Sequence, residues 1–462
     1  MALWKSCERC CAALLLCGVL GSPAGRAQEP PPLAAEEQDA ESLKPKLTFG
    51  LEAKANFRHS DDNRFPVPFP FLPSQLPPGQ TQGFEETVNP GDHLEVSDAI
   101  LYMDASWGDG LAAHGKVSFI DLYTRNPTST GKSVDVHEAW IRFGVETPPA
   151  TLAPRGGVYL KVGKLPKFER QNDRHLESYG LVSTAFNRLE DVGAELGLNL
   201  GRHLYVKAAA TAGNPVFLRD PNALAGDNGT PELLRPNPDP TLYSGIVILY
   251  DAKVEDLDTD GKLAASAGLG WRTADEAGRN GFDVLVFGHQ RKLAKTVPRD
   301  GSFYGGDLDL LNGPGDGRIL PIKGDDKKEV GGNLWVYFGG FSFFAQYVDQ
   351  KLAGLPRTGL EGEVAWRFDL PLVWAIGGRQ LFTYVAPAVR YSKLDNGFRN
   401  IPPTPAPSFA WDWQKIDAGV RLGIFPGVDL TAEYAINHFI LGSGATRENN
   451  EGLATLRWRI QG

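Results

Sequence analysis

From residue 47 to the C-terminus, apolar and polar residues alternate along the chain. In the first segment, residues 47–57, Leu47 and Phe49 fall on one face of an extended chain. Glu52 and Lys54 fall on the opposite face. Successive side chains of a β-strand point to opposite sides of the sheet, so this period of two predicts a strand with one apolar face.

The same alternation recurs in segments of about ten residues, which is the length of a strand that crosses a membrane. The predicted strands are residues 47–57, 94–107, 112–123, 133–146, 157–164, 190–200, 203–213, 243–254, 262–272, 281–293, 329–338, 341–350, 358–368, 381–393, 412–424, 428–439 and 451–460. Their number is odd, whereas bacterial single-chain barrels have even numbers of strands. One assignment between residues 214 and 280 is therefore wrong, and either 16 or 18 strands are expected.

The connections between these segments differ in length. Tight turns such as Gly201-Arg202 and Phe425-Pro426-Gly427 have the residues of short hairpin connections. The long connections are rich in Pro, Gly and Asp, and they comprise residues 58–92, 165–189, 214–241, 294–328 and 395–411. Short turns at one end and long loops at the other predict an all-β fold, a transmembrane antiparallel β-barrel over residues 47–462.

A soluble β-sheet protein is the alternative fold, because half-buried soluble sheets also alternate. The sequence has no repeat of the kind found in propellers, and its segments exceed the roughly 5–6 residues usual in soluble sheets. No apolar run after the N-terminus reaches the ~18 residues of a membrane helix. The formal net charge of −9 disfavours nucleic acid as a partner.

Residues 1–27 have the features of a secretory signal peptide, with Lys5 and Arg9 ahead of an apolar stretch and Ala27 at the predicted cleavage site. A lipoprotein cleaved before Cys17 is the alternative. Residues 28–46 are rich in proline and then in acidic residues, which predicts a disordered lead-in. The four cysteines all precede Ala27, so the mature chain has none.

The middle of the sequence carries a family resemblance. Residues 159–169 read Tyr-Leu-Lys-Val-Gly-Lys-Leu-Pro-Lys-Phe-Glu, and after a loop residues 188–196 read Arg-Leu-Glu-Asp-Val-Gly-Ala-Glu-Leu. This strand, loop and strand start resembles the phosphate-selective porin O/P family. The resemblance implies an outer-membrane porin that forms a water-filled channel, prefers anions including phosphate-type anions, and assembles as a homotrimer.

The charged residues of such a pore are its candidate functional groups, because charge at a narrow point selects ions. Loop 165–189 is expected to fold into the lumen as the constriction, with a mobile surface loop as the alternative. The candidates for the constriction and for anion binding are Arg142, Lys161, Lys164, Lys167, Arg170 and Arg174. The alternation predicts further basic side chains in the lumen: Lys54, Lys207, Lys253, Arg367, Arg390, Arg421 and Arg457.

Other chemistry has little support in the sequence. Asp256, Asp258 and Asp260 match the first half of a calcium-binding loop, but Ala267 stands where the loop needs a bidentate glutamate. No catalytic motif of the serine hydrolase, zinc protease or nucleotide-binding type is present, so neither an enzyme nor a cofactor is expected. We therefore expect a porin of the bacterial outer membrane that contacts lipid and small anionic solutes, with an outer-membrane barrel in a surface, adhesin or structural role as the alternative.

Overall fold

The structure is a computed structural model of the 462-residue chain, in which Pro45–Gly462 form one compact unit. It describes residues 45–61, 91–108, 110–121, 134–152, 156–171, 173–187, 190–212, 263–275, 279–293, 323–398, 411–440 and 444–461, together with the backbone of 65–68, 82–86, 234–235 and 245–247. The predicted signal peptide and nearly all of the lead-in lie outside these residues.

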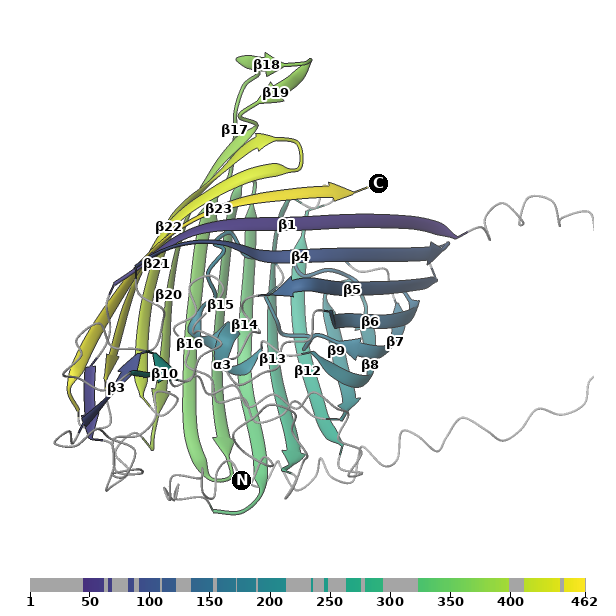
Figure 1. Cartoon of the computed structure of the whole chain (residues 1–462). Coiled ribbons are helices and arrows are strands. Elements are labelled where there is room, and N and C mark those ends of the chain that lie inside the picture. The colour runs from purple at the N-terminus through teal and green to yellow at the C-terminus, as the bar shows by residue number, and fades with distance from the viewer. Residues whose placement is uncertain are drawn as a thin grey trace, which may run out of the picture. The chain divides into compact units, whose positions relative to one another are not determined.

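Within the described residues, sixteen antiparallel strands close into a barrel (Figure 1). They are β1 (Lys46–Ser60), β4 (Gly91–Trp107), β5 (Leu111–Asp121), β6 (Asp135–Gly144), β7 (Val158–Leu165), β8 (Asp191–Leu200), β9 (Leu204–Thr211), β12 (Ala264–Ala274), β13 (Asn280–Lys292), β14 (Asp326–Phe338), β15 (Phe341–Leu352), β16 (Leu355–Trp366), β20 (Tyr384–Asn396), β21 (Asp412–Phe425), β22 (Val428–Ile440) and β23 (Thr446–Gln461). Each strand pairs with the next in this order, and β1 closes the sheet by pairing with both β4 and β23. The predicted fold class is confirmed, with the lower of the two expected strand numbers.

The error in the sequence-based count is the segment 243–254. Its residues Gly245–Val247 form β11, which pairs with β3 (Gln82–Glu86) and β10 (Leu234–Arg235) in a small separate sheet that also holds β2 (Phe65–Pro68). In the barrel, β9 pairs directly with β12, with Ala208 opposite Ala267. Alternation cannot distinguish a barrel strand from a β-rich part of a long connection, which explains the error.

The longest connections begin at one end of the barrel, and most tight turns lie at the other end, which also carries the connection between β6 and β7. The long connections after β1, β7, β9, β13 and β20 all lie at one end, which we call the long-loop end. The opposite, short-turn end holds tight turns such as Gly201–His203 and the start of β1 beside the end of β23. Beyond β16 this end also carries β17 (Phe368–Asp369) and a hairpin of β18 (Trp374–Ile376) and β19 (Arg379–Leu381).

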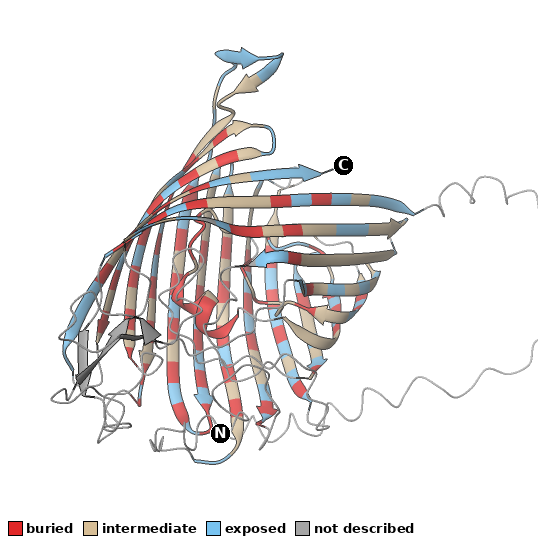
Figure 2. Cartoon of the chain, viewed as in Figure 1, coloured by how far each residue is buried: buried red, intermediate tan, exposed pale blue. Residues whose placement is uncertain are grey.

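Burial alternates along the strands in the opposite sense to that of a soluble protein (Figure 2). Outward apolar side chains such as Leu47 and Phe49 are more than half exposed, whereas inward Glu52 and Asn56 are almost completely buried. The wall is thus apolar outside and polar inside, which is the arrangement of a barrel that spans a membrane.

The connection between β7 and β8, residues 166–190, is called the inner loop below, and its described residues lie inside the barrel. It contains the short helix α3 (Leu181–Phe186), which Figure 1 shows within the ring of strands. Among the described residues, no helix is long and apolar enough to cross a membrane. The expected inward fold of this loop is confirmed, whereas its role in limiting flow through the pore stays a prediction.

Apolar packing holds α3 against one side of the lumen. Its buried residues Leu181, Val182 and Phe186 join a cluster that includes Trp413 and Phe439 on the inner wall. Aromatic side chains on an inward face are unusual for a water-filled lumen, whose lining is mostly polar. This part of the lumen is therefore filled by a packed core, a feature that the sequence analysis did not predict.

Candidate functional site

The inner loop is tied to the wall by hydrogen bonds from its own backbone. The amide groups of Glu177 and Ser178 each donate to the carboxylate of Glu433 on β22, both at 2.8 Å. Arg390 on β20 donates to the hydroxyl of Ser178 at 2.6 Å and to Asp417 on β21 at 2.9 Å. Charged side chains of the wall therefore bind uncharged polar groups of the loop.

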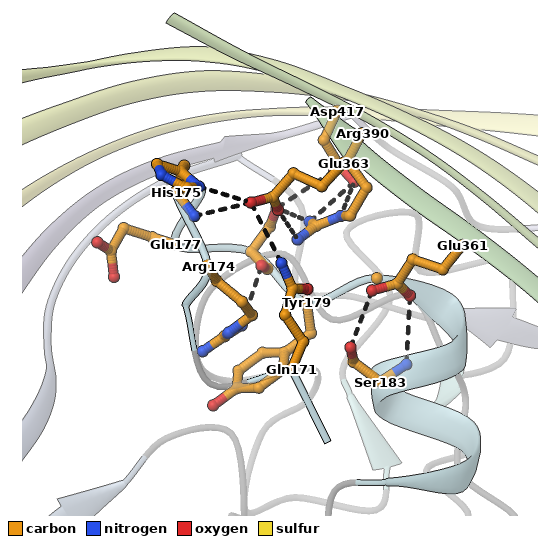
Figure 3. Close-up of polar contacts among 12 residues, drawn as sticks. Gln171, Arg174, His175, Glu177, Tyr179, Ser183, Glu361, Glu363, Arg390 and Asp417 are labelled. Carbon is orange, nitrogen blue, oxygen red and sulfur yellow. Dashed lines mark hydrogen bonds and ion pairs between the residues drawn. The ribbon is translucent and has the colours of Figure 1, made fainter. Parts of the chain in front are cut away.

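Two glutamates on β16 hold the next part of the loop (Figure 3). Glu363 accepts hydrogen bonds from the backbone amide and the imidazole of His175, at 2.9 and 3.0 Å. Glu361 accepts from the amides of Val182 and Ser183 in the first turn of α3, at 3.0 and 3.2 Å. Free amide groups at the start of a helix need such acceptors, so β16 fixes where the helix begins.

Gly180, just before α3, leaves room for the Glu361 carboxylate. A Cβ atom at this position would lie 2.0 Å from Oε2 of Glu361, closer than two atoms can approach. A larger residue would therefore displace the Glu361 carboxylate from the amides at the start of α3.

Glu177 is the centre of a second charged group. Its carboxylate lies 2.8 Å from Arg421, 3.1 Å from Lys54 and 3.7 Å from Arg457. Burial by itself raises the pKa of Glu177, but Lys54, Arg421 and Arg457 outweigh burial and hold this pKa well below the usual range of a carboxyl. Three residues predicted to line the lumen therefore meet at one carboxylate of the inner loop.

Three predicted constriction residues lie in the inner loop itself, and each has a partner. Lys167 pairs with Glu329 on β14 at 2.9 Å, and Arg170 pairs with Glu190 at 2.5 Å. The guanidinium of Arg174 lies 3.7 Å from the centre of the Tyr179 ring. Lys167 thus fastens the loop to the wall, and the charges of Lys167 and Arg170 are each compensated by a carboxylate.

Arg142 on β6, Lys161 on β7 and Lys207 on β9 meet at a different place, and we call them the basic trio. All three surround the carboxylate of Glu146, in the connection between β6 and β7, at distances of 3.8, 2.7 and 3.5 Å respectively. Lys207 also lies 3.7 Å from Glu195 on β8. Arg142 lies directly opposite Lys161 in the sheet. Lys207 lies opposite Gly197 on β8, the strand between β7 and β9, so the three side chains are close together.

The backbone that carries Glu146 also folds inward, which the sequence analysis missed. Arg272 on β12 donates to the carbonyl groups of Thr147 and Pro148, at 3.1 and 3.2 Å. The amide of Ala150 donates to Asp283 on β13 at 3.3 Å. These contacts are made largely by backbone atoms, so the residue types of the turn gave no signal of them.

The remaining predicted residues are spread more widely. Lys164 donates to the carbonyl of Val136 at the long-loop end, at 2.5 Å. Arg367 stands at the short-turn end, about half exposed, 2.9 Å from Asp369. Lys253, Asp256, Asp258 and Asp260 lie outside the described residues. Among the residues that the structure does describe, no group of three or more His, Cys, Asp or Glu side chains is placed to hold a metal ion.

Exposure differs between the two sides of the lumen. The inward side chains Arg390, Lys415 and Asp417 on β20 and β21 are fully buried beneath the inner loop. By contrast, Arg142 and Glu146 each keep 22% of their side-chain surface exposed. Water therefore reaches the pair of Arg142 and Glu146 more readily than it reaches Arg390, Lys415 and Asp417.

Comparisons with known proteins extend only to overall shape. No family model and no curated protein matches the chain. Among solved structures, the outer membrane channel DcaP of Acinetobacter baumannii aligns with 90% of this chain and 97% of its own, at 12% identity and a TM-score of 0.47. OprB of Pseudomonas putida aligns with 93% and 96% of the two chains, at 10% identity and a TM-score of 0.47. The outer membrane protein opdK of Pseudomonas aeruginosa aligns with 90% and 99%, at 12% identity and a TM-score of 0.37. These values establish no family, so the resemblance to phosphate-selective porins stays a prediction, and the function is inferred from the barrel's own wall and lumen.

Proposed function

We propose that the protein is an outer-membrane porin that lets small solutes, with a preference for anions, diffuse through a channel narrowed by the inner loop. The observation that carries the proposal is the closed barrel with an apolar exterior, a charged interior and a basic trio on the side of the lumen that water reaches. No binding energy or chemical step is needed for such transport.

The exterior supports a membrane location. Outward residues such as Phe143, Leu196 and Val286 are about half exposed, and comparable side chains occur on every long strand of the wall. In water, so much contiguous apolar surface would promote aggregation. In a bilayer it faces lipid, and a closed barrel leaves no strand edge with unpaired backbone groups.

Anion preference is supported by the charges on the accessible side. Arg142, Lys161 and Lys207 face two carboxylates there, those of Glu146 and Glu195. An excess of positive charge between walls of low dielectric attracts anions and repels cations.

The inner loop narrows the channel as a fixed element in this proposal. Ion pairs and backbone hydrogen bonds tie it to β14, β16 and β20–β22, and α3 packs in an apolar cluster. Flow would therefore pass beside the loop, along β5–β7, rather than wait for the loop to open.

The cellular location and the oligomeric state of the protein are proposed from its sequence. The signal peptide over residues 1–27 would export the chain, and the long-loop end would face the outside of the cell, as in other outer-membrane barrels. A homotrimer, the expectation from the family resemblance, is part of the proposal.

Purified mature protein in planar bilayers tests this function. We expect steady conductance. Across a potassium chloride gradient, the reversal potential should shift from zero toward the equilibrium potential of chloride. The double variant Lys161→Gln/Lys207→Gln should move the reversal potential toward the potassium side, whereas Arg367→Gln, at the exposed short-turn end, should not. Absence of conductance would contradict a porin and favour the surface or structural role.

A further inference from the structure

We propose that the basic trio is a binding site for the oxyanion group of a passing solute, and that Glu146 occupies this site as an internal competitor. This inference rests on the proposed function. It adds a defined site within the pore and a residue that sets how strongly the site binds.

The geometry is that of a filled anion site. Three cations from three strands converge on one carboxylate, and the nearest of them, Lys161, lies 2.7 Å from it. Burial raises the pKa of Glu146, yet Lys207, Lys161 and Arg142 together lower this pKa to about 2, so the carboxylate is charged at neutral pH. A carboxylate or phosphate group of a solute offers the same kind of oxygen acceptors.

Glu146 can leave the site without unfolding its support. The backbone beyond it is held by Arg272 and Asp283, which contact Thr147, Pro148 and Ala150 rather than the Glu146 side chain. Rotation of the Glu146 side chain alone would open the place between the cations. The partial exposure of Glu146 and Arg142 gives a solute access to that place.

Aromatic rings complete the surroundings. Lys161 lies 4.9 Å from the centre of the Trp140 ring, and Lys207 lies 5.9 Å from the rings of Tyr159 and Phe168. Such rings stabilise the ammonium groups when the carboxylate is absent, through their negative faces. The cations thus remain in place when Glu146 moves away.

The test compares Glu146→Gln with Glu138→Gln, both measured as inhibition of the chloride current by added anions. Glu138 is an inward carboxylate on the same strand as Arg142, and the imidazole of His114 lies 3.8 Å from it. The probes are succinate, for a carboxylate source, and inorganic phosphate, for a phosphate source. Glu146→Gln should lower the inhibition constant of at least one probe by about tenfold, and Glu138→Gln should change it by less than about twofold.

Adding Lys161→Gln to Glu146→Gln should abolish the gain, whereas adding Arg367→Gln, which makes the same change in net charge at the exposed short-turn end, should leave it. The probe with the larger gain identifies the chemical source of the oxyanion. Equal effects of Glu146→Gln and Glu138→Gln would overturn the internal competitor while leaving the porin intact. Loss of chloride current in the wild-type protein would instead contradict the proposed function itself. Heat-modifiable migration on gels verifies that each variant is folded.

Discussion

Arg390 on β20 donates a hydrogen bond to the hydroxyl of Ser178 in the inner loop, 2.6 Å away, although 212 residues separate the two in the chain. The same guanidinium contacts Asp417 and Glu363 on the neighbouring wall, and all three charged side chains are buried. One side chain thus joins the loop to three strands of the barrel. The loop is therefore held rigidly against the wall by this side chain.

Replacing Arg390 with methionine should destabilise the barrel strongly. Asp417 and Glu363 would lose a buried cation, and removal of one partner from a buried ion pair costs about 3–5 kcal/mol. Urea unfolding of refolded protein in detergent measures the loss. Arg367→Met is the matched control, because its pair with Asp369 is exposed and should be worth about 0–1 kcal/mol. Equal unfolding midpoints for the two variants would contradict the structural role of Arg390.

Deleting residues 168–186 should raise single-channel conductance severalfold. The deletion removes α3 and most of the loop, and it opens the side of the lumen along β20 and β21 to water. As a control, replacing the hairpin 374–381 at the short-turn end by a tight turn should leave conductance unchanged. An unchanged conductance in the loop deletion would show that the loop does not narrow the path.

Gly180→Ala should disturb the start of α3. The added Cβ would meet the carboxylate of Glu361, and relief of that overlap displaces this carboxylate from the amides of Val182 and Ser183. Overpacking of this kind typically costs about 1–3 kcal/mol. Gly110→Ala is the control, because nothing lies within 4 Å of the new atom there. Thermal unfolding of both variants checks the prediction, and equal melting temperatures would refute the close contact at Gly180.

The contribution of Glu177 to stability should be lost only in acid. Because its pKa is lowered in the folded protein, its ion pairs stabilise fully above the unfolded pKa of about 4.3. That stabilisation disappears as the pH falls through the lower, folded pKa. Glu177→Gln should therefore be destabilised relative to wild type at pH 7, by an amount that is constant down to about pH 5 and shrinks below it. Unfolding midpoints measured across pH provide the test, and a difference that grows toward acid would contradict it.

The barrel could be predicted because its wall repeats one simple rule. Most positions of the long strands follow one rule, with apolar residues toward lipid and polar residues toward the lumen, and this leaves a period of two in the sequence. The rule fails where a β-rich segment belongs to a connection, as with Gly245–Val247 in β11. It also gives no information on which inward residues meet, because the register between distant strands is set only when the sheet closes.

The candidate site could be predicted only in part. Arg142, Lys161 and Lys207 were each expected in the pore from residue type and spacing. Their meeting at Glu146 depends on a turn that is fixed by backbone hydrogen bonds to Arg272 and Asp283, and such contacts leave no trace in the residue pattern. The inward aromatic cluster was missed for a related reason, since Trp413 and Phe439 have partners only when α3 is inside the barrel.

The most direct test of a channel that runs along β5–β7 uses single cysteines, because all four native cysteines lie within residues 1–27. Ala112 on β5 lies opposite Arg142, and Ala435 on β22 is fully buried within the barrel. Each is replaced by cysteine in the mature chain, and a negatively charged thiosulfonate reagent is added while current is recorded in a planar bilayer. We predict that Ala112→Cys reacts and that its chloride current falls, whereas the chloride current of Ala435→Cys stays the same. A current that falls only in Ala435→Cys, or a protein that carries no current, would contradict it.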